Sequence, residues 1–163
     1  LEFRRVLFRS ALIDSTVVRG INIAQGPKKN GPQAIGRSQG GLSTKIHTTV
    51  DALGNPTGFH LTAGQASDLE GADRLVPSLK APTLIGDKGY DAQARVITVL
   101  PEAGKQAVIP PRCNRKALRS YDKGLYKARH LVENFFAKLK QFRAMPLLPA
   151  MTKPLAISWP LSI

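Results

Sequence analysis

A run of polar residues near the carboxyl end of the chain has the spacing of one edge of a helix. Tyr126, Arg129, Glu133 and Lys140 are separated by three, four and seven residues. At about 100° per residue these positions fall on one narrow stripe. A lone carboxylate among bases is the arrangement that a metal site facing a phosphate backbone needs. Periodicity alone favours an ordinary amphipathic helix with a solvated basic face. The apolar residues of the same predicted helix gather on a different face: Leu131, Val132, Phe135, Leu139 and Phe142, with Phe136 at the margin.

Two aspartates, Asp14 and Asp87, each follow a short apolar run that reads as a buried strand. The carboxyl ends of neighbouring parallel strands converge on one crevice. Glu133, from a helix packed beside that sheet, can supply a third carboxylate. Each aspartate alone is equally well explained as a turn or cap residue. Several other acids have predicted local duties: Asp51 in a turn, Asp68 and Glu70 at a helix start, and Asp91 as a helix cap.

Three converging carboxylates repel one another unless a cation lies between them. Oxygen ligands of this kind are preferred by hard divalent ions, so the set Asp14, Asp87 and Glu133 predicts Mg²⁺, with Mn²⁺ able to substitute. Two such ions roughly 3.5–4 Å apart can activate an attacking oxygen and stabilise a leaving one in phosphodiester displacement.

Five segments together resemble a known family. They are Ala11-Leu-Ile-Asp14-Ser-Thr, the glycine-rich stretch 31–47, Gly86-Asp87-Lys-Gly-Tyr-Asp91, Val108-Ile-Pro-Pro-Arg112, and the spacing Tyr126-x2-Arg129-x3-Glu133-x6-Lys140. These resemble the bacterial insertion-sequence transposases of the DDE class, in particular insertion sequence family five, in the superfamily that it shares with family four. The resemblance extends from about residue 11 to residue 143.

The resemblance implies that Asp14, Asp87 and Glu133 are the catalytic triad and the metal ligands. Water, and then a freed 3′-hydroxyl, would be the successive nucleophiles in DNA cleavage and strand transfer. Arg129 and Lys140 would hold phosphate near the metals, and a guanidinium suits bidentate phosphate contact. The implied partners are DNA, as transposon ends and target, and further copies of the chain in a homo-oligomer on paired ends.

Three further residues are candidates for DNA contact. Tyr126 would stack on or hydrogen-bond to DNA, or else is a buried tyrosine that closes the helix start. Lys88 and Lys45 are candidate contacts to the DNA backbone, or else solvated surface lysines.

The charge balance agrees with a nucleic-acid partner. The formal net charge is +13, from 24 Lys and Arg against 11 Asp and Glu. Between Lys105 and Arg143 lie eleven bases, opposed only by Asp122 and Glu133. A segment with this density of basic residues typically binds phosphate, because binding a polyanion releases its counterions. The alternative is a solvated or ribosome-like basic surface. We predict that the Lys105–Arg143 block forms one positive face bordering the acidic cluster.

Composition also excludes several classes of protein. Cys113 is the single cysteine, so neither a disulfide framework nor a zinc cluster is expected. No segment has eighteen uninterrupted apolar residues, so no membrane span is predicted. We expect a cytoplasmic protein at the bacterial nucleoid, without a membrane partner.

The order of apolar and turn-forming segments predicts alternating strands and helices. An antiparallel hairpin followed by helix–strand units fits a ribonuclease-H-like α/β fold with a mixed sheet flanked by helices, which the family resemblance also implies. Strands are predicted at 11–13, 43–50, 57–62, 82–86 and 106–109, helices at 67–79 and from 91 to about 100, and a long loop at 20–41.

Both ends of the chain differ from its middle. We expect residues 1–10 to be a non-native leader, 11–143 to be a transposase catalytic domain truncated at its N-terminus, and 144–163 to be a frameshifted, poorly ordered tail with four prolines. On this basis we expect the chain to be poorly stable and inactive. Two alternatives remain open: a non-catalytic DNA-binding remnant of a mobile element, and another ribonuclease-H-like metal-dependent nuclease.

Overall fold

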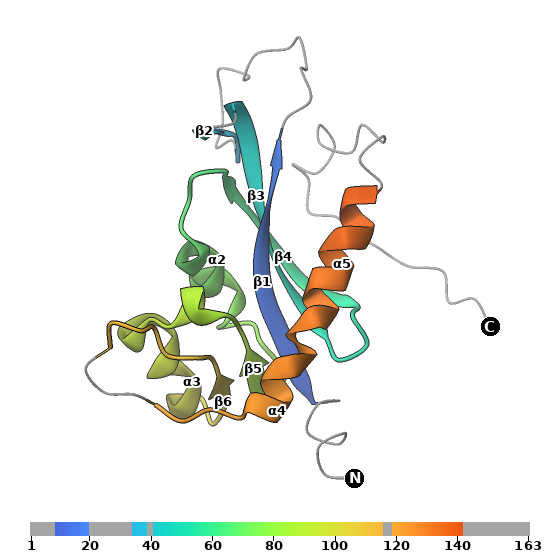
Figure 1. Cartoon of the computed structure of the whole chain (residues 1–163). Coiled ribbons are helices and arrows are strands. Elements are labelled where there is room, and N and C mark those ends of the chain that lie inside the picture. Colours follow the sequence, from blue (N-terminus) through green and yellow to red (C-terminus); the bar gives the residue numbers. More distant parts are fainter. Residues whose placement is uncertain (1–8, 20–33, 39–40, 116–118, 142–163) are drawn as a thin grey trace, which may run out of the picture.

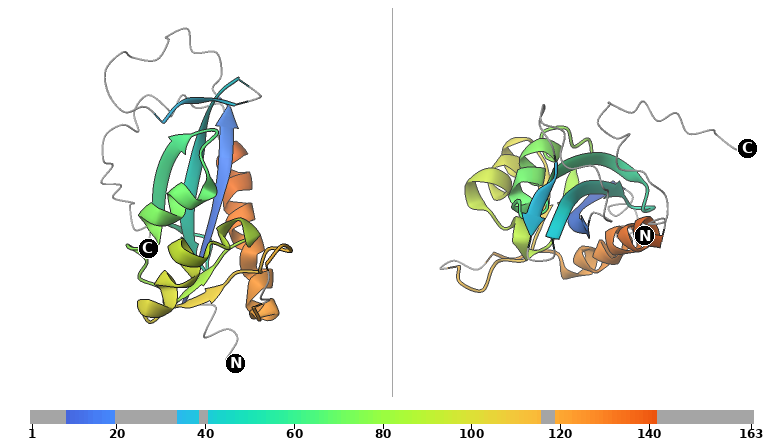
Figure 2. Two further views of the ribbon diagram at one scale, coloured as in Figure 1. Left: turned by 90° about the vertical axis from the view of Figure 1, so that its left-hand side faces the viewer. Right: turned by 90° about the horizontal axis from the view of Figure 1, so that it is seen from above.

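The structure, a computed structural model, describes residues 9–19, 34–38, 41–115 and 119–141. These residues form a sheet with helices on both of its faces (Figures 1 and 2). The predictions for a tail at 144–163, for most of the leader at 1–10, and for Phe142 and Arg143 lie outside the described residues.

The sheet combines an antiparallel half with a parallel half. β1 pairs antiparallel with β3, which in turn pairs antiparallel with β2 and β4, whereas β5 and β6 continue the sheet parallel to β1. This mixed sheet, flanked by helices, confirms the predicted ribonuclease-H-like α/β class. The strands are β1 (Ser10–Arg19), β2 (Gly36–Ser38), β3 (Gly41–Asp51), β4 (Pro56–Ala63), β5 (Thr83–Ile85) and β6 (Gln106–Val108).

Alternation along β1 separates two apolar clusters. Ala11 and Ile13 are buried against α2 (Asp68–Leu75) and α3 (Val99–Glu102), whereas Leu12 is buried on the opposite face under α5 (His130–Gln141). Successive side chains of a strand point to opposite faces, so one strand contributes to both clusters. Figure 2 shows the sheet between these two groups of helices.

The first helix starts where the sequence predicts and ends sooner. The Ser67 side chain accepts a hydrogen bond from Leu69 N, and Glu70 completes the predicted capping box. α2 ends at Leu75, not at Leu79. Pro77 has no backbone N–H with which to continue the helical hydrogen bonds.

The helix predicted from Asp91 to about Leu100 is wrong in form. The chain instead makes a 3₁₀ turn, η1 (Lys88–Tyr90), then a π-helical turn, η2 (Gln93–Ile97), and then the short α3. Asp91 ends η1 as its C-cap and is not the N-cap of the following helix, because Ala92 precedes η2 and makes no side-chain cap hydrogen bond. The Asp91 carboxylate is buried against arginines from another part of the chain, as described below.

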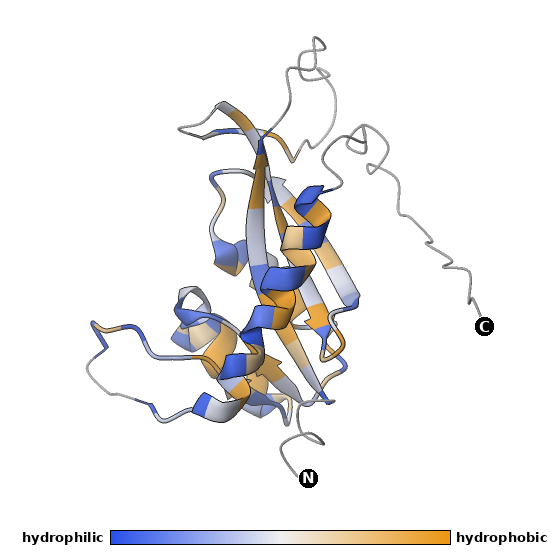
Figure 3. Ribbon diagram, turned by 45° about the vertical axis from the view of Figure 1, so that its right-hand side comes forward, coloured by the Kyte–Doolittle hydropathy of each residue, from blue (hydrophilic) through white to orange (hydrophobic). Residues whose placement is uncertain are grey.

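The helical region that carries Glu133 is present, with a break in its geometry. α4 (Lys123–Tyr126) leads through a 3₁₀ turn, η3 (Lys127–Arg129), into α5. Phe136, predicted at the margin of the apolar face, is only 5% exposed and lies in the core with Val132. Leu131, Phe135 and Leu139 are partly buried beside them. Figure 3 shows the resulting alternation of hydrophilic and hydrophobic bands along α5.

Part of the predicted loop at 20–41 belongs to the sheet. β2 pairs with the start of β3 in the register Gly36↔Ser43. β1 also runs on to Arg19, because β3 pairs with it along its whole second half. None of the helices in the described ranges is long and apolar enough to cross a membrane.

Candidate active site

Asp14 and Asp87 come together where the parallel part of the sheet ends. The prediction that Asp14 ends its strand is wrong, because β1 continues past it, paired with β3. The neighbouring strand β5, however, stops at Ile85, opposite Leu12. Asp14 and Asp87 each lie two residues beyond this last parallel pair, so the register places them beside one another.

Glu133 reaches the same place from α5, and Arg129 joins all three carboxylates. Arg129 Nη2 lies 2.5 Å from Glu133 Oε1 and 3.8 Å from Asp14 Oδ2, while its Nη1 lies 3.6 Å from Asp87 Oδ2. Asp14 and Glu133 contact the same nitrogen, so these two oxygens are no farther apart than the sum of the two distances. The sheet and α5 therefore bring together the three carboxylates that the sequence singles out.

Burial makes Asp14 a weaker acid than an ordinary aspartate. Desolvation raises its pKa from 3.8 to about 6, against the hydrogen bond from Ser15 N at 2.8 Å and the charge of Arg129, both of which lower it. The nearby negative charges of Asp87 and Asp68 raise the pKa further. Asp14 is still mainly ionised at pH 7, so this cluster carries net negative charge around one guanidinium.

The chemistry of these oxygens fits a hard divalent cation, and a cationic group already lies among them. In the described part of the chain, no three or more His, Cys, Asp or Glu residues are arranged to hold a metal ion. The three carboxylates Asp14, Asp87 and Glu133 instead contact the Arg129 guanidinium. A cation that binds these oxygens would compete for them with the Arg129 guanidinium.

A fourth carboxylate, Asp68, lies close by and was assigned from the sequence only to a helix start. Ser15 Oγ donates to Asp68 Oδ1 at 2.5 Å, and Lys45 Nζ donates to the same oxygen at 3.1 Å. Burial raises the pKa of Asp68, but these hydrogen bonds outweigh it and hold the pKa below its ordinary value. Asp68 thus ties the start of α2 to the residue after Asp14, a contact that no local pattern reveals.

The predicted DNA-contacting residues are not equivalent in the structure. The Lys45 ammonium already has partners within the protein, since its Nζ donates to the Ala66 carbonyl at 2.6 Å as well as to Asp68. Lys88 and Lys140 are exposed. Tyr126 is partly buried and packs edge-to-face on Tyr121, with ring centroids 5.5 Å apart, which fits the packing alternative.

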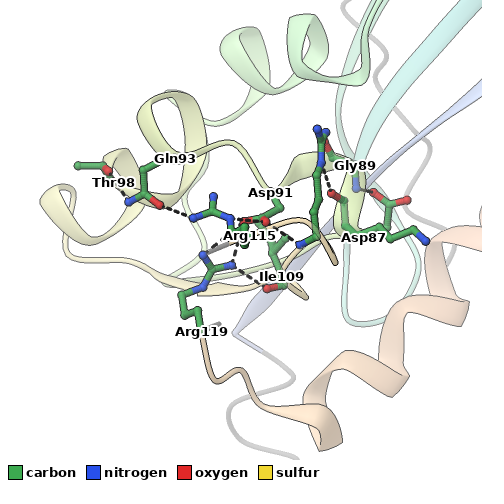
Figure 4. A network of polar contacts seen from close by, with 10 residues as sticks. Asp87, Gly89, Asp91, Gln93, Thr98, Ile109, Arg115 and Arg119 are labelled. Atoms are coloured by element: carbon green, nitrogen blue, oxygen red, sulfur yellow. Dashed lines mark hydrogen bonds and ion pairs between the residues drawn. The ribbon is translucent and has the colours of Figure 1, made fainter. Parts of the chain in front are cut away.

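Among the described residues, three bases of the Lys105–Arg143 block have internal partners, and the single positive face stays a prediction. Arg115 and Arg119 pair with the buried Asp91, as Figure 4 shows, and Lys105 Nζ donates to the Leu79 carbonyl. These bases are held by internal acceptors. The exposed bases later in the block lie on α4, η3 and α5: Lys123, Lys127, Lys138 and Lys140.

Comparison with known proteins identifies the family. The model of the transposase DDE domain matches residues 9–147, so the chain belongs to this family. A Brucella ovis protein named as a candidate transposase for the insertion sequence element IS6501 is 35% identical over 107 residues, which are 65% of this chain and 82% of the relative. Among solved structures, the Mos1 transposase in its paired-end complex with the left transposon end matches with a TM-score of 0.39 and 11% identity. That match covers 86% of this chain and 57% of the Mos1 chain.

Proposed function

We propose that this transposase domain cuts DNA and joins the freed end to a target, with Asp14, Asp87 and Glu133 as its catalytic carboxylates. The observation that carries the proposal is the convergence of these three side chains, from β1, the end of β5 and α5, on Arg129. Membership of the family gives the reaction class, and the name of the Brucella ovis relative supports an insertion sequence as the mobile element. Family five within that class stays a prediction, as do the domain limits 11–143.

The proposed metal ligands are the same three carboxylates. We infer that they hold two Mg²⁺ ions, with Mn²⁺ as a substitute, which would supply Lewis-acid stabilisation of the attacking and leaving oxygens. Asp14 on β1, Asp87 in the turn after β5 and Glu133 on α5 would hold these ions. Arg129, which contacts all three carboxylates, would pair with a phosphate oxygen of the DNA, for which its planar guanidinium is suited.

The proposed reaction has two displacements on phosphorus. In the first, a water oxygen bonds to the phosphorus at the transposon end, the bond from phosphorus to the 3′-oxygen breaks, and a free 3′-hydroxyl results. In the second, that hydroxyl attacks a target phosphodiester, forming a new phosphorus–oxygen bond and releasing a target 3′-hydroxyl. Lys140 and Lys88 are both exposed, and we propose that they contact backbone phosphates. The chain is proposed to form a homo-oligomer on paired ends.

A strand-transfer assay tests the proposal. Labelled element ends, a supercoiled target plasmid and Mg²⁺ are incubated with the chain, and with a longer version that carries the upstream and downstream segments of its relatives. Asp14→Asn, Asp87→Asn and Glu133→Gln should each abolish cleavage and joining without abolishing DNA binding. Asp51→Asn is the matched control, because Asp51 caps the β3–β4 turn through hydrogen bonds from Leu53 N and Asn55 N.

The products distinguish the alternatives. Cleavage without joining would indicate a nuclease, and binding without cleavage by either version would indicate a DNA-binding remnant. Activity of the longer version alone would agree with the expectation that the 163-residue chain is inactive. Cleavage that survives Asp87→Asn would contradict the proposed triad.

A further inference from the structure

We propose that Asp91 and Arg112 are positioning residues that hold the Asp87 carboxylate in place. Neither residue belongs to the carboxylate cluster, and the inference rests on the proposed function only in taking Asp87 as a metal ligand. The two residues are connected to Asp87 by a continuous series of hydrogen bonds through the turn η1 (Lys88–Tyr90).

The series begins at the Asp91 carboxylate, whose side chain is fully buried. Its Oδ2 accepts from Arg112 N at 2.8 Å and from Arg115 Nε at 2.6 Å, and its Oδ1 accepts from Arg119 Nη2 at 3.3 Å. The Asp91 side chain is 0% exposed. A buried carboxylate with this many donors fixes the backbone of the segment that follows β6.

The next step runs from Arg112 back to the turn. Arg112 Nε donates to the Lys88 carbonyl at 3.1 Å and Nη2 donates to the Gly89 carbonyl at 2.9 Å. One planar guanidinium thus spans two consecutive carbonyls. A 3₁₀ turn of three residues has few hydrogen bonds of its own, so an external clamp determines how its peptides are oriented.

The last step reaches Asp87 itself. Gly89 N donates to Asp87 Oδ1 at 2.7 Å, so the orientation of the Gly89 peptide sets the orientation of the carboxylate. The Gly89 backbone packs closely against this carboxylate, because a Cβ at position 89 would lie 2.8 Å from the same Oδ1. Figure 4 shows Asp91 in the middle of the drawn network with Arg115 and Arg119. Gly89 and Asp87 lie on one side of it and Gln93 and Thr98 on the other.

The ordinary alternative is that the Asp91 cluster only fastens the connector after β6 to the domain. The two roles differ in what a mild change at Arg112 does. Arg112→Lys keeps the positive charge and the backbone N–H to Asp91, but one ammonium cannot reproduce the bidentate contact. A positioning role predicts that this variant disturbs Asp87, whereas a fastening role predicts that it does not.

The test measures Mn²⁺ binding to the purified chain without DNA. The electron paramagnetic resonance signal of the free ion reports how much Mn²⁺ remains unbound. Asp91→Asn and Arg112→Lys should weaken Mn²⁺ binding about 10- to 100-fold, the range typical for residues that orient metal ligands. Asp73→Asn and Arg95→Lys are matched controls, because Asp73 and Arg95 form an exposed ion pair between α2 and η2. Both controls should bind Mn²⁺ like the wild type.

Hydrogen–deuterium exchange supplies a readout that needs no metal. Arg112→Lys should speed amide exchange in segment 86–91 while segment 68–75, in α2, exchanges as in the wild type. Equal acceleration in both segments would overturn the positioning role, and so would unchanged Mn²⁺ binding in Arg112→Lys when Asp87→Asn binds weakly. Should Asp91→Asn fail to fold, Arg112→Lys decides the question alone. Unchanged Mn²⁺ binding in Asp87→Asn would instead contradict the proposed function, and with it the inference.

Discussion

Arg129 and Glu133 lie one helical turn apart, and their side chains pair at 2.5 Å between Nη2 and Oε1. The same guanidinium also reaches Asp14 and Asp87. Arg129 is therefore the shared counter-ion of the three carboxylates in the cluster. Its pKa stays above the ordinary value, because the hydrogen bond to Glu133 and the charge of Asp14 outweigh the effect of burial.

Replacing Arg129 by Gln should tighten divalent-ion binding in the absence of DNA. Without the guanidinium the carboxylates repel one another and the site is open to a cation, so we expect roughly tenfold stronger Mg²⁺ binding, about 1.4 kcal/mol. Calorimetric titration with Mg²⁺ measures this directly. Arg95→Gln is the control, because its partner Asp73 lies outside the cluster. Affinity equal to that of the wild type would show that Arg129 and the metal do not compete.

Replacing Lys140 by Ala should weaken DNA binding about equally for all sequences and reduce the slope of log K against log salt by about 1. Lys140 is exposed on α5, so it can neutralise a backbone phosphate. Fluorescence anisotropy at several salt concentrations gives the slope. Lys138→Ala, an exposed lysine on the same helix outside the stripe of Glu133 and Lys140, serves as the comparison. If Lys138→Ala and Lys140→Ala reduce the slope of log K against log salt equally, the stripe that carries Glu133 and Lys140 has no particular role in DNA binding.

Replacing Phe136 by Ala should cost about 3–5 kcal/mol of unfolding free energy. Phe136 is 5% exposed and packs with Val132 over the sheet, so the change leaves a cavity between α5 and β1. Phe59→Ala is the matched comparison, because Phe59 on β4 is 44% exposed. It should cost less than half as much unfolding free energy as Phe136→Ala. Urea denaturation of both variants measures the difference, and equal losses would mean that α5 is not docked as described.

His47 should make the fold less stable as the pH falls. Burial lowers its pKa from 6.5 to about 4, so between these values the unfolded chain takes up a proton that the folded chain does not. The stability contributed by neutral His47 is complete above pH 6.5 and is lost as the pH falls toward 4. Asp14, with its raised pKa, acts in the opposite direction over part of this window.

The comparison with His47→Gln isolates this effect, because Asp14 is unchanged in that variant. Gln can keep a hydrogen bond to Thr62 Oγ1, which lies 2.8 Å from His47 Nε2. The free energy of unfolding, measured between pH 4 and 7, should fall more steeply with acidity in the wild type. Parallel curves for the two proteins would rule out His47 as the cause.

The sequence predicts those parts of the site that depend on local spacing. The placement of Arg129 and Glu133 on one edge of a helix follows from helical periodicity, and the capping box at Ser67 follows from a short motif. The sequence does not reveal the length of β1, because the polar residues after Asp14 are held in the strand by pairing with β3. Local rules also misassign Asp91, since an aspartate before a helical pattern resembles a cap, while its actual partners lie 21 to 28 residues further along the chain.

Anomalous X-ray diffraction from crystals soaked in MnCl₂ tests most directly whether Asp14, Asp87 and Glu133 form a metal-binding catalytic cluster. We predict anomalous density for manganese bonded to carboxylate oxygens of Asp14 and Asp87, next to Glu133, with the Arg129 side chain turned out of its contacts at 3.6 and 3.8 Å. Manganese bound elsewhere at saturating concentration, with Arg129 still in contact with both aspartates, would contradict the proposed active site.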